Sequence, residues 1–209
     1  MKSTTSQYRS ILINYLPKEY VAYVLQLLSD HPVRFKIVKP RKTKLGDFRA
    51  GGKNEKHQIT INGNLNPYSF LITTLHEFAH LIAFNTYGKR IAPHGEEWKE
   101  AFTNLLIPII ESGDLPKDIE NSILKSLTRI KASSCTDIQL QRTLMRYDSI
   151  SDDTFTLESL DKNSTFALNG KVFVKGNLRR TRYLCKDVES KKEYLVHALA
   201  QVIKLENEQ

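Results

Sequence analysis

Two histidines four residues apart, His76 and His80, are the feature that most narrows what this chain can fold into. On an α-helix, residues at this spacing are rotated by only about 40° around the axis, so both imidazoles can reach one metal ion. Glu77 follows the first histidine, where a carboxylate can take a proton from metal-bound water without binding the metal itself. The pattern predicts a helical zinc site with Glu77 as the catalytic base.

The surrounding sequence predicts the helix that this site needs, over about residues 67–85. Asn66 followed by Pro67 is a favoured helix start, and Gly88 is placed to end the helix. Apolar residues recur at spacings of three and four and predict a buried stripe: Ile72, Leu75, Ala79 and Ile82. The alternative interpretation of the two histidines is a pair of hydrogen-bonded core residues without a metal.

A hydrolytic zinc site needs a third protein ligand and one open position. His94 is the best candidate, because it follows His80 by fourteen residues across a loop that contains a glycine and a proline. Glu96 and Glu97 are the rival ligands, although both are also well placed to stabilise the first turn of a following helix. The alternative for His94 is a loop histidine exposed to solvent.

The remaining patterns predict an α+β fold in which residues 1–150 form the catalytic domain. Helical periodicity covers residues 7–30, with a break at Pro17, and two more helices are expected after Gly95 and from about residue 114 to residue 130. Alternation of apolar and polar residues predicts strands near residues 33–37, 45–50 and 58–62.

The character of the sequence changes near residue 150. Short β-rich segments follow, with a hairpin signal at Asn169-Gly170 and a second turn signal at Gly176-Asn177. We therefore expect residues 151–209 to form a small all-β module of the SH3-like barrel type.

The two cysteines, Cys135 and Cys185, are widely separated and form no CxxC pair, which argues against a disulfide framework and a cysteine-built zinc ribbon. The chain has no apolar run of bilayer length and no apolar segment near its N-terminus. We expect a cytoplasmic protein without membrane contact.

Lysine and arginine exceed aspartate and glutamate by 31 to 23, and a formal net charge of +8 favours polyanionic partners, nucleic acid first. We expect DNA to bind through one basic cluster: Arg34, Lys36, Lys39, Arg41, Lys42, Lys44 and Arg49. A second run lies in the β module: Arg179, Arg180 and Arg182. The alternative for both runs is a solvated basic surface.

The segment HEFAHLIAFNTYGKRIAPHGEEWKEAF, residues 76–102, resembles the active-site region of SprT-like metalloproteases, which include the DNA–protein crosslink protease Spartan. Members of that family have an HExxH helix, a short loop, and then His-Gly opening a helix with an aromatic residue a few positions on. His94, Gly95 and Trp98 match this pattern. The stretch KIVKPRKTKLGDFRA resembles the family's strand with a Leu-Gly pair, and the resemblance covers roughly residues 5–130.

This resemblance implies a zincin-like α+β fold, a zinc ion, and hydrolysis of peptide bonds near DNA. It also implies that a strand near residues 58–62 forms the edge of the cleft. The chain departs from the family in one respect, because many members end in a zinc ribbon with four metal-binding cysteines and this chain has no such set. A second, structural zinc is not expected, and a DNA-binding role of the ribbon cannot be transferred.

The predicted function is a zinc-dependent endopeptidase acting on protein substrates, with DNA-bound proteins as candidates. His76, His80 and His94 would hold Zn²⁺, and Glu77 would act as general base and later as proton donor. One alternative is a metal hydrolase acting on a non-peptide bond. Another is a basic nucleic-acid-binding protein with a structural zinc site. The presence of Glu77 argues against this alternative, because a structural site needs no base. The sequence leaves the oligomeric state open.

Overall fold

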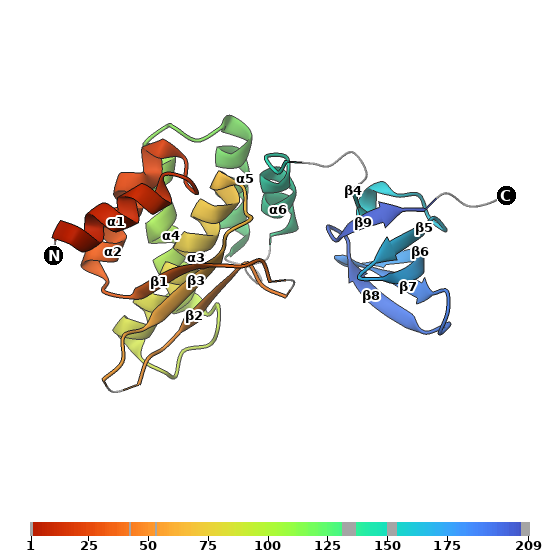
Figure 1. The fold of residues 1–209 in the computed structure, drawn as a ribbon, viewed down its shortest axis with the longest axis horizontal. Helices are drawn as coiled ribbons and strands as arrows, with labels where there is room; N and C mark the ends of the chain where they lie inside the picture. Colours follow the sequence, from red (N-terminus) through yellow and green to blue (C-terminus); the bar gives the residue numbers. More distant parts are fainter. Residues whose placement is uncertain (1, 42, 53, 131–136, 150–153, 206–209) are drawn as a thin grey trace. The chain divides into compact units, whose positions relative to one another are not determined.

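A computed structural model of the 209-residue chain describes residues 2–41, 43–52, 54–130, 137–149 and 154–205, with backbone alone for residues 2–6 and 128–130 (Figure 1). The chain divides into two compact units, Met1–Asp148 and Ser149–Gln209. The predicted mixture of helix and sheet is confirmed. No helix in the described ranges is both long and apolar enough to cross a bilayer.

The first unit is built around one long, apolar helix, α3 (Pro67–Tyr87). Phe70, Leu71, Leu75 and Phe78 of this helix are completely buried at the centre of a single hydrophobic core. The other helices are α1 (Lys2–Leu12), α2 (Val21–Asp30), α4 (Glu96–Glu111), α5 (Lys117–Ile130) and α6 (Ile138–Met145), with a 3-10 turn at Lys18–Tyr20. The sequence patterns predicted all of these helices except α6.

A three-stranded sheet packs against this helical core in the order β1-β3-β2. Its strands are β1 (Arg34–Val38), β2 (Gly46–Arg49) and β3 (Gln58–Asn62), with β3 parallel to β1 and antiparallel to β2. The expectation that residues 58–62 form an edge is therefore wrong, because β3 is the central strand and four of its five residues are buried. Of the two strands at the edges of this sheet, β2 is the one that borders helix α3.

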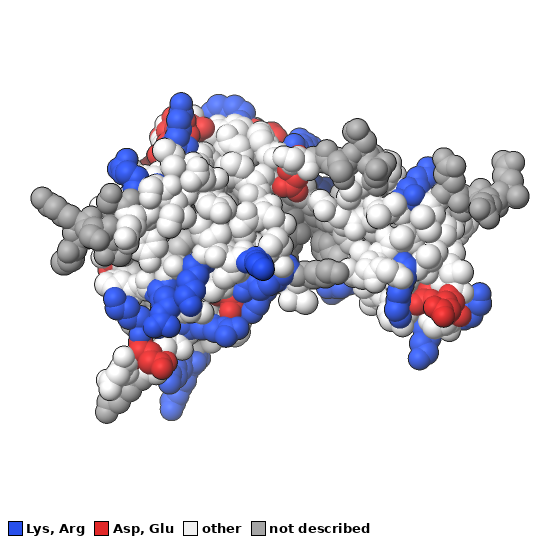
Figure 2. Space-filling model, in the orientation of Figure 1, with Lys and Arg blue, Asp and Glu red and all other residues white. Residues whose placement is uncertain are grey.

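The two faces of this sheet differ in chemistry. Phe35, Ile59 and Phe48, which are paired across the three strands, contribute to the hydrophobic core. The next residues along the strands alternate to the opposite face. Arg34 and Arg49 are exposed there and flank Gln58 in one row. Figure 2 shows Lys and Arg side chains gathered over the region of this sheet.

The second unit is a six-stranded sheet with its own core, in the order β4-β9-β5-β6-β7-β8. The strands are β4 (Thr154–Thr156), β5 (Thr165–Leu168), β6 (Lys171–Arg179), β7 (Arg182–Asp187), β8 (Glu193–His197) and β9 (Gln201–Lys204), with a 3-10 turn at Leu157–Ser159. A separate all-β region is thus confirmed, whereas its SH3-like barrel type stays a prediction.

Of the two turns expected in this unit, one is confirmed and one is wrong. Asn169 and Gly170 have φ angles of 52° and 77° and connect β5 to β6 as a hairpin. Gly176 and Asn177 instead lie within β6, where the pairing with β7 shifts between Lys175 and Leu178. A side chain at Gly176 would meet the carbonyl oxygen of Leu184, so the glycine serves a close approach of two strands.

Candidate metal centre

Helix α3 carries both histidines of the sequence motif and is capped as the sequence predicts. The side chain of Asn66 accepts a hydrogen bond from the backbone N–H of Ser69, and Pro67 is in the first turn. Gly88, with a φ of 80°, ends the helix. His76 and His80 are therefore fixed on a rigid element whose neighbouring turns are buried in the core.

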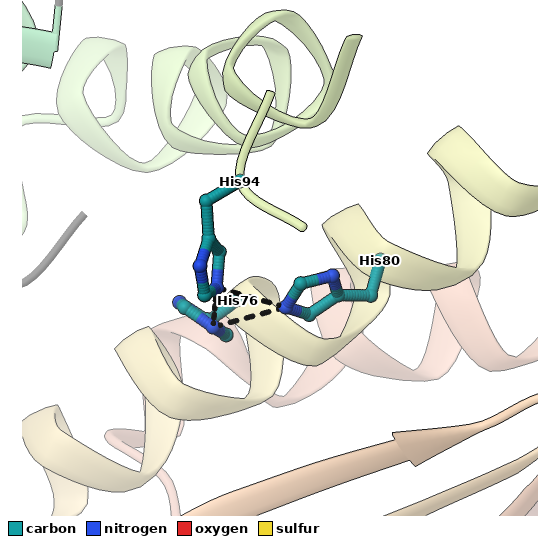
Figure 3. Close-up of side chains that lie close together, drawn as sticks. All are labelled: His76, His80 and His94. Atoms are coloured by element: carbon teal, nitrogen blue, oxygen red, sulfur yellow. Dashed lines mark hydrogen bonds between the residues drawn. The ribbon is translucent and has the colours of Figure 1, made fainter. Parts of the chain in front are cut away.

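The structure brings the three predicted metal ligands together (Figure 3). The Nε2 atom of His80 lies 3.2 Å from that of His76 and 3.1 Å from that of His94, and the His76 and His94 atoms are 3.1 Å apart. Within the described ranges, this is the group of potential ligand side chains whose donor atoms converge closely enough for one ion. The site could hold a metal ion.

Hydrogen bonds alone cannot satisfy this triangle of nitrogens. Each imidazole Nε2 either carries a hydrogen or presents a lone pair, so at least two of three mutually adjacent atoms are of the same kind and oppose each other. Three nitrogens about 2.0–2.1 Å from one tetrahedral ion lie roughly 3.3 Å apart. The observed spacings of 3.1–3.2 Å fit such an ion.

The environment keeps these imidazoles in the neutral form that binds metals. Burial, with smaller contributions from the neighbouring histidines, lowers the pKa of His76 to about 3. Burial and the nearby His94 lower the pKa of His80 to about 4, and burial also lowers the pKa of His94. At neutral pH all three rings are therefore uncharged, and each has one nitrogen with a lone pair that a metal ion can bind.

Trp98 of helix α4 packs against all three histidines. Its ring centroid lies 4.7 Å from that of His76, 5.4 Å from that of His80 and 4.8 Å from that of His94. The indole is 1% exposed and stacks on Phe102 one turn further along the helix. The start of α4 thus holds the ligand loop and shields one side of the triangle from water.

His94 itself has an unusual backbone, with a φ of 59° in the left-handed region. This conformation is unfavourable for a residue with a side chain, and it persists where the surrounding structure imposes it. The backbone N–H of the next residue, Gly95, donates to the carbonyl of Ala92 and closes a tight turn around the histidine. That turn directs the third imidazole toward α3.

The rival ligands Glu96 and Glu97 do not join the three histidines. Glu96 accepts a hydrogen bond from Lys99, its neighbour one turn along α4, at 2.7 Å. Both glutamates lie in the first turn of α4, where their charge stabilises the helix N-terminus.

Glu77 lies next in sequence to His76 and is almost completely buried, with 6% of its surface exposed. Burial, and secondly the nearby Asp47 carboxylate, raise the pKa of Glu77 to about 7. The carboxylate accepts a hydrogen bond from the backbone N–H of Phe48, which acts in the opposite direction. At neutral pH, Glu77 is therefore balanced between its charged and neutral forms.

Strand β2 is the part of the site that the sequence patterns did not assign. The ring of Phe48 lies parallel to that of His80, with an interplanar angle of 8° and 6.5 Å between centroids. Phe48 thus touches a candidate ligand with its side chain and the candidate base with its backbone. The sequence does show that Gly46 and Phe48 lie on the same face of one strand. It does not show that this face packs on α3, and without that packing neither residue can be assigned to the site.

The basic cluster is only partly free to meet a partner. Arg41 donates to the side chains of Asn62 and Thr60, both at 2.9 Å, so it covers the outer face of β3. Lys44 and Arg49 both donate to Asp47, each at 2.7 Å. Arg34, Lys36 and Lys39 are exposed, and Lys42 lies outside the described residues.

Fold and site together define an α+β protein in which a helix-borne pair of histidines and a loop histidine form a centre that could hold a metal ion, beside a buried glutamate. Residues 14–109 match the model of the SprT-like family, so this part of the chain is similar to that family.

The similar proteins include several named Protein SprT. That of Vibrio parahaemolyticus is 44% identical over 57 residues, covering 24% of this chain and 34% of the relative. That of Actinobacillus succinogenes is 40% identical over 55 residues, covering 24% and 32%. That of Pseudomonas fluorescens is 63% identical over 27 residues, covering 13% and 16%. The chain thus spans about a third or less of these curated relatives. No solved structure matches it.

Proposed function

We propose that this chain is a zinc-dependent endopeptidase of the SprT-like type, with a zincin-like fold around α3. His76, His80 and His94 would hold the zinc ion, and three protein donors leave one position of a tetrahedral ion for water. The observation that carries the proposal is the convergence of three neutral imidazoles beside a buried glutamate with a pKa of about 7.

The chemistry follows from the protonation state of Glu77. When bound, zinc polarises the scissile carbonyl and acidifies a coordinated water. Glu77 accepts a proton from the attacking water and later delivers it to the departing nitrogen of the peptide. In the metal-free protein, burial raises the pKa of Glu77 to about 7, and the charge of a bound zinc ion would favour the carboxylate that accepts the proton.

We place the protein substrate along strand β2. This strand is the edge of the described sheet next to α3, and an extended peptide can add to such an edge through backbone hydrogen bonds. The family resemblance placed the edge of the cleft at residues 58–62, and we propose that residues 46–49 form this edge instead.

DNA-bound proteins are the substrates that the charge favours. The exposed cations Arg34 and Lys36 lie on the outer face of β1, and Lys39 lies in the loop that follows this strand. Their side chains can neutralise phosphates and release counterions, which would bring the protease to proteins on nucleic acid.

Metal analysis combined with proteolysis tests the proposed function. Wild type and Glu77→Gln should each bind one zinc ion, while Glu77→Gln loses roughly 100-fold or more of the hydrolysis of a basic protein in the presence of DNA. His94→Ala should lose both zinc and hydrolysis, whereas Glu96→Ala and Glu97→Ala keep both. Full activity of Glu77→Gln would refute the base, and zinc retained by His94→Ala but lost by a glutamate variant would refute the ligand set.

The same experiment decides between the protease and a nucleic-acid-binding protein with a structural zinc. In the second case, wild-type protein binds zinc and DNA but cleaves no protein under any condition, and Glu77→Gln behaves like wild type. The deep burial of Glu77 favours the protease, since burying an ionisable group costs stability and such groups are found preferentially at functional sites.

Charge reversal tests the contact with DNA. The triple variant Arg34→Glu, Lys36→Glu and Lys39→Glu should weaken binding and flatten its dependence on salt, because phosphate contacts are lost. Arg41 and Lys44 are left intact, because their bonds to β3 and to Asp47 support the fold. A matched variant reverses three exposed lysines elsewhere, Lys18, Lys162 and Lys192. Equal weakening by both variants would mean that only net charge matters.

A further inference from the structure

Strand β2 passes directly over the side chain of Glu77, and the residue at the point of closest approach is Gly46. A Cβ atom at Gly46 would lie 2.5 Å from Oε1 and 2.7 Å from Cγ of Glu77, and 2.8 Å from Cγ2 of Thr73. Non-bonded carbon atoms are normally about 3.5–4.0 Å apart. Any side chain at position 46 would therefore displace Glu77 or the strand.

Neither partner has an easy way to move. Glu77 is 6% exposed, and the contact would reach its Cγ as well as the end of its side chain. Strand β2 is paired with β3 from Gly46 to Arg49. On the outer face of β2, Asp47 is held from two sides by Lys44 and Arg49 at 2.7 Å each.

The close approach has a direct consequence for the candidate base. Two residues beyond Gly46, the backbone N–H of Phe48 donates to the Glu77 carboxylate, and the Phe48 ring lies parallel to His80. Residues 46 and 48 lie on the same face of the strand because side chains alternate. Because residue 46 has no side chain, β2 can approach Glu77 closely enough for the backbone N–H of Phe48 to hold the carboxylate beside the metal ligands.

We propose that Gly46 is a positioning residue for Glu77. Its lack of a side chain allows β2 to hold the carboxylate in the orientation that proton transfer requires. The effect on hydrolysis rests on the proposed function, whereas the steric coupling of Gly46 to Glu77 does not.

The catalytic consequence is measured with Gly46→Ala. The variant should bind one zinc ion, because the three histidines keep their positions, while its kcat falls at least about tenfold and its KM stays within about twofold. The matched control is Gly52→Ala, where the nearest atom to an added Cβ is 3.8 Å away, and it should retain wild-type kcat. A wild-type kcat for Gly46→Ala would overturn the proposal.

A double-mutant cycle on thermal unfolding tests the coupling without any assay of activity. Gly46→Ala should lower the melting temperature of the wild type, and it should lower that of Glu77→Ala by less than half as much, because the colliding atoms are gone. Thr73→Ser removes the other close atom in a parallel cycle. Equal losses in the wild-type and Glu77→Ala backgrounds, or a loss relieved only by Thr73→Ser, would overturn the proposal.

Two further outcomes are also decisive. If Gly46→Ala is too unstable to purify, recovery of the folded protein by adding Glu77→Ala supports the coupling, and failure to recover it contradicts the coupling. If wild-type protein hydrolyses no protein, the proposed function fails while the unfolding cycle still decides whether Gly46 accommodates Glu77.

Discussion

The ionisation of Glu77 links the chemistry of the site to the stability of the fold. Its pKa is raised from 4.5 to about 7, so the folded state binds the proton more tightly than the unfolded chain between these values. Stability from this group is therefore lost as the pH rises from about 4.5 to about 7. The half-buried histidines act oppositely, because their lowered pKa values make stability rise from about pH 3 to about pH 6.5.

Glu77→Gln isolates the first effect in metal-free protein. The variant should gain stability relative to the wild type as the pH rises from 4.5 to above 7, by at most about 3.5 kcal/mol, since one pKa unit corresponds to about 1.4 kcal/mol. Urea unfolding in chelator at pH 4.5, 6 and 8 measures the difference, in which the contributions of the histidines cancel. A difference that does not change with pH would mean that Glu77 titrates normally.

At the same scale, the sequence predicted the donors of the site but not what holds them. His76, His80 and His94 could be proposed because helical geometry and the ligand number of zinc act locally on the chain. The contacts of Gly46 and Phe48 with Glu77 and His80 could not, because they depend on how closely a strand distant in sequence packs on α3.

At the scale of the elements, the start of α3 is fixed by the residue that precedes it, Asn66. The amide of Asn66 caps the helix through Ser69 and also donates to the carbonyl of Leu144 and to Asp148, at the end of α6. A single side chain therefore fixes the functional helix and the helix that follows α5.

Asn66→Ala should destabilise the first unit by about 2 kcal/mol, roughly 1 kcal/mol for the cap and a similar amount for the lost buried hydrogen bond. Asn14→Ala is the control, because Asn14 makes an exposed bond to the carbonyl of Ser10 within one turn. The shift in the urea midpoint of unfolding measures both. Equal shifts would show that neither the cap nor the bonds of Asn66 to Leu144 and Asp148 contribute more than the exposed bond of Asn14.

The elements that sequence reasoning missed or misplaced share a physical cause. Thr60 and Asn62 read as the solvent-facing side of a strand, but Arg41 covers them and both are buried. Strand β3 is central because it pairs with β1 on one side and with β2 on the other. Helix α6 is only eight residues long, and part of what fixes it is the bond between Tyr147 and Asp118 of α5. Tertiary contacts of polar side chains are not visible in hydrophobic periodicity.

At the scale of the whole molecule, the chain separates into two units with separate cores. The second core contains Phe166, Phe173, Cys185 and Val202, all contributed by strands beyond residue 164. The division falls between Asp148 and Ser149, and the assignment of residues 1–150 to a protease domain and of residues 151–209 to a small β module stays a prediction.

We expect a protein of residues 149–209 to fold alone. Its sheet pairs only strands of its own unit among the described residues, and these strands have a hydrophobic core of their own. Circular dichroism should show a β-type spectrum and a cooperative melting transition that a chelator leaves unchanged. A spectrum of disordered chain would show that the second unit needs the first.

The left-handed backbone of His94 bears on how selection can act on this chain. A side chain in that conformation costs roughly 1–2 kcal/mol, a penalty that glycine escapes. Random mutation followed by selection for stability alone would therefore favour glycine at position 94 and remove the third imidazole with it. In libraries screened for thermostability, residue 94 should be sequenced in each selected variant, because a variant stabilised by glycine there has lost the metal centre. The histidine can persist only where the function of the centre is selected as well.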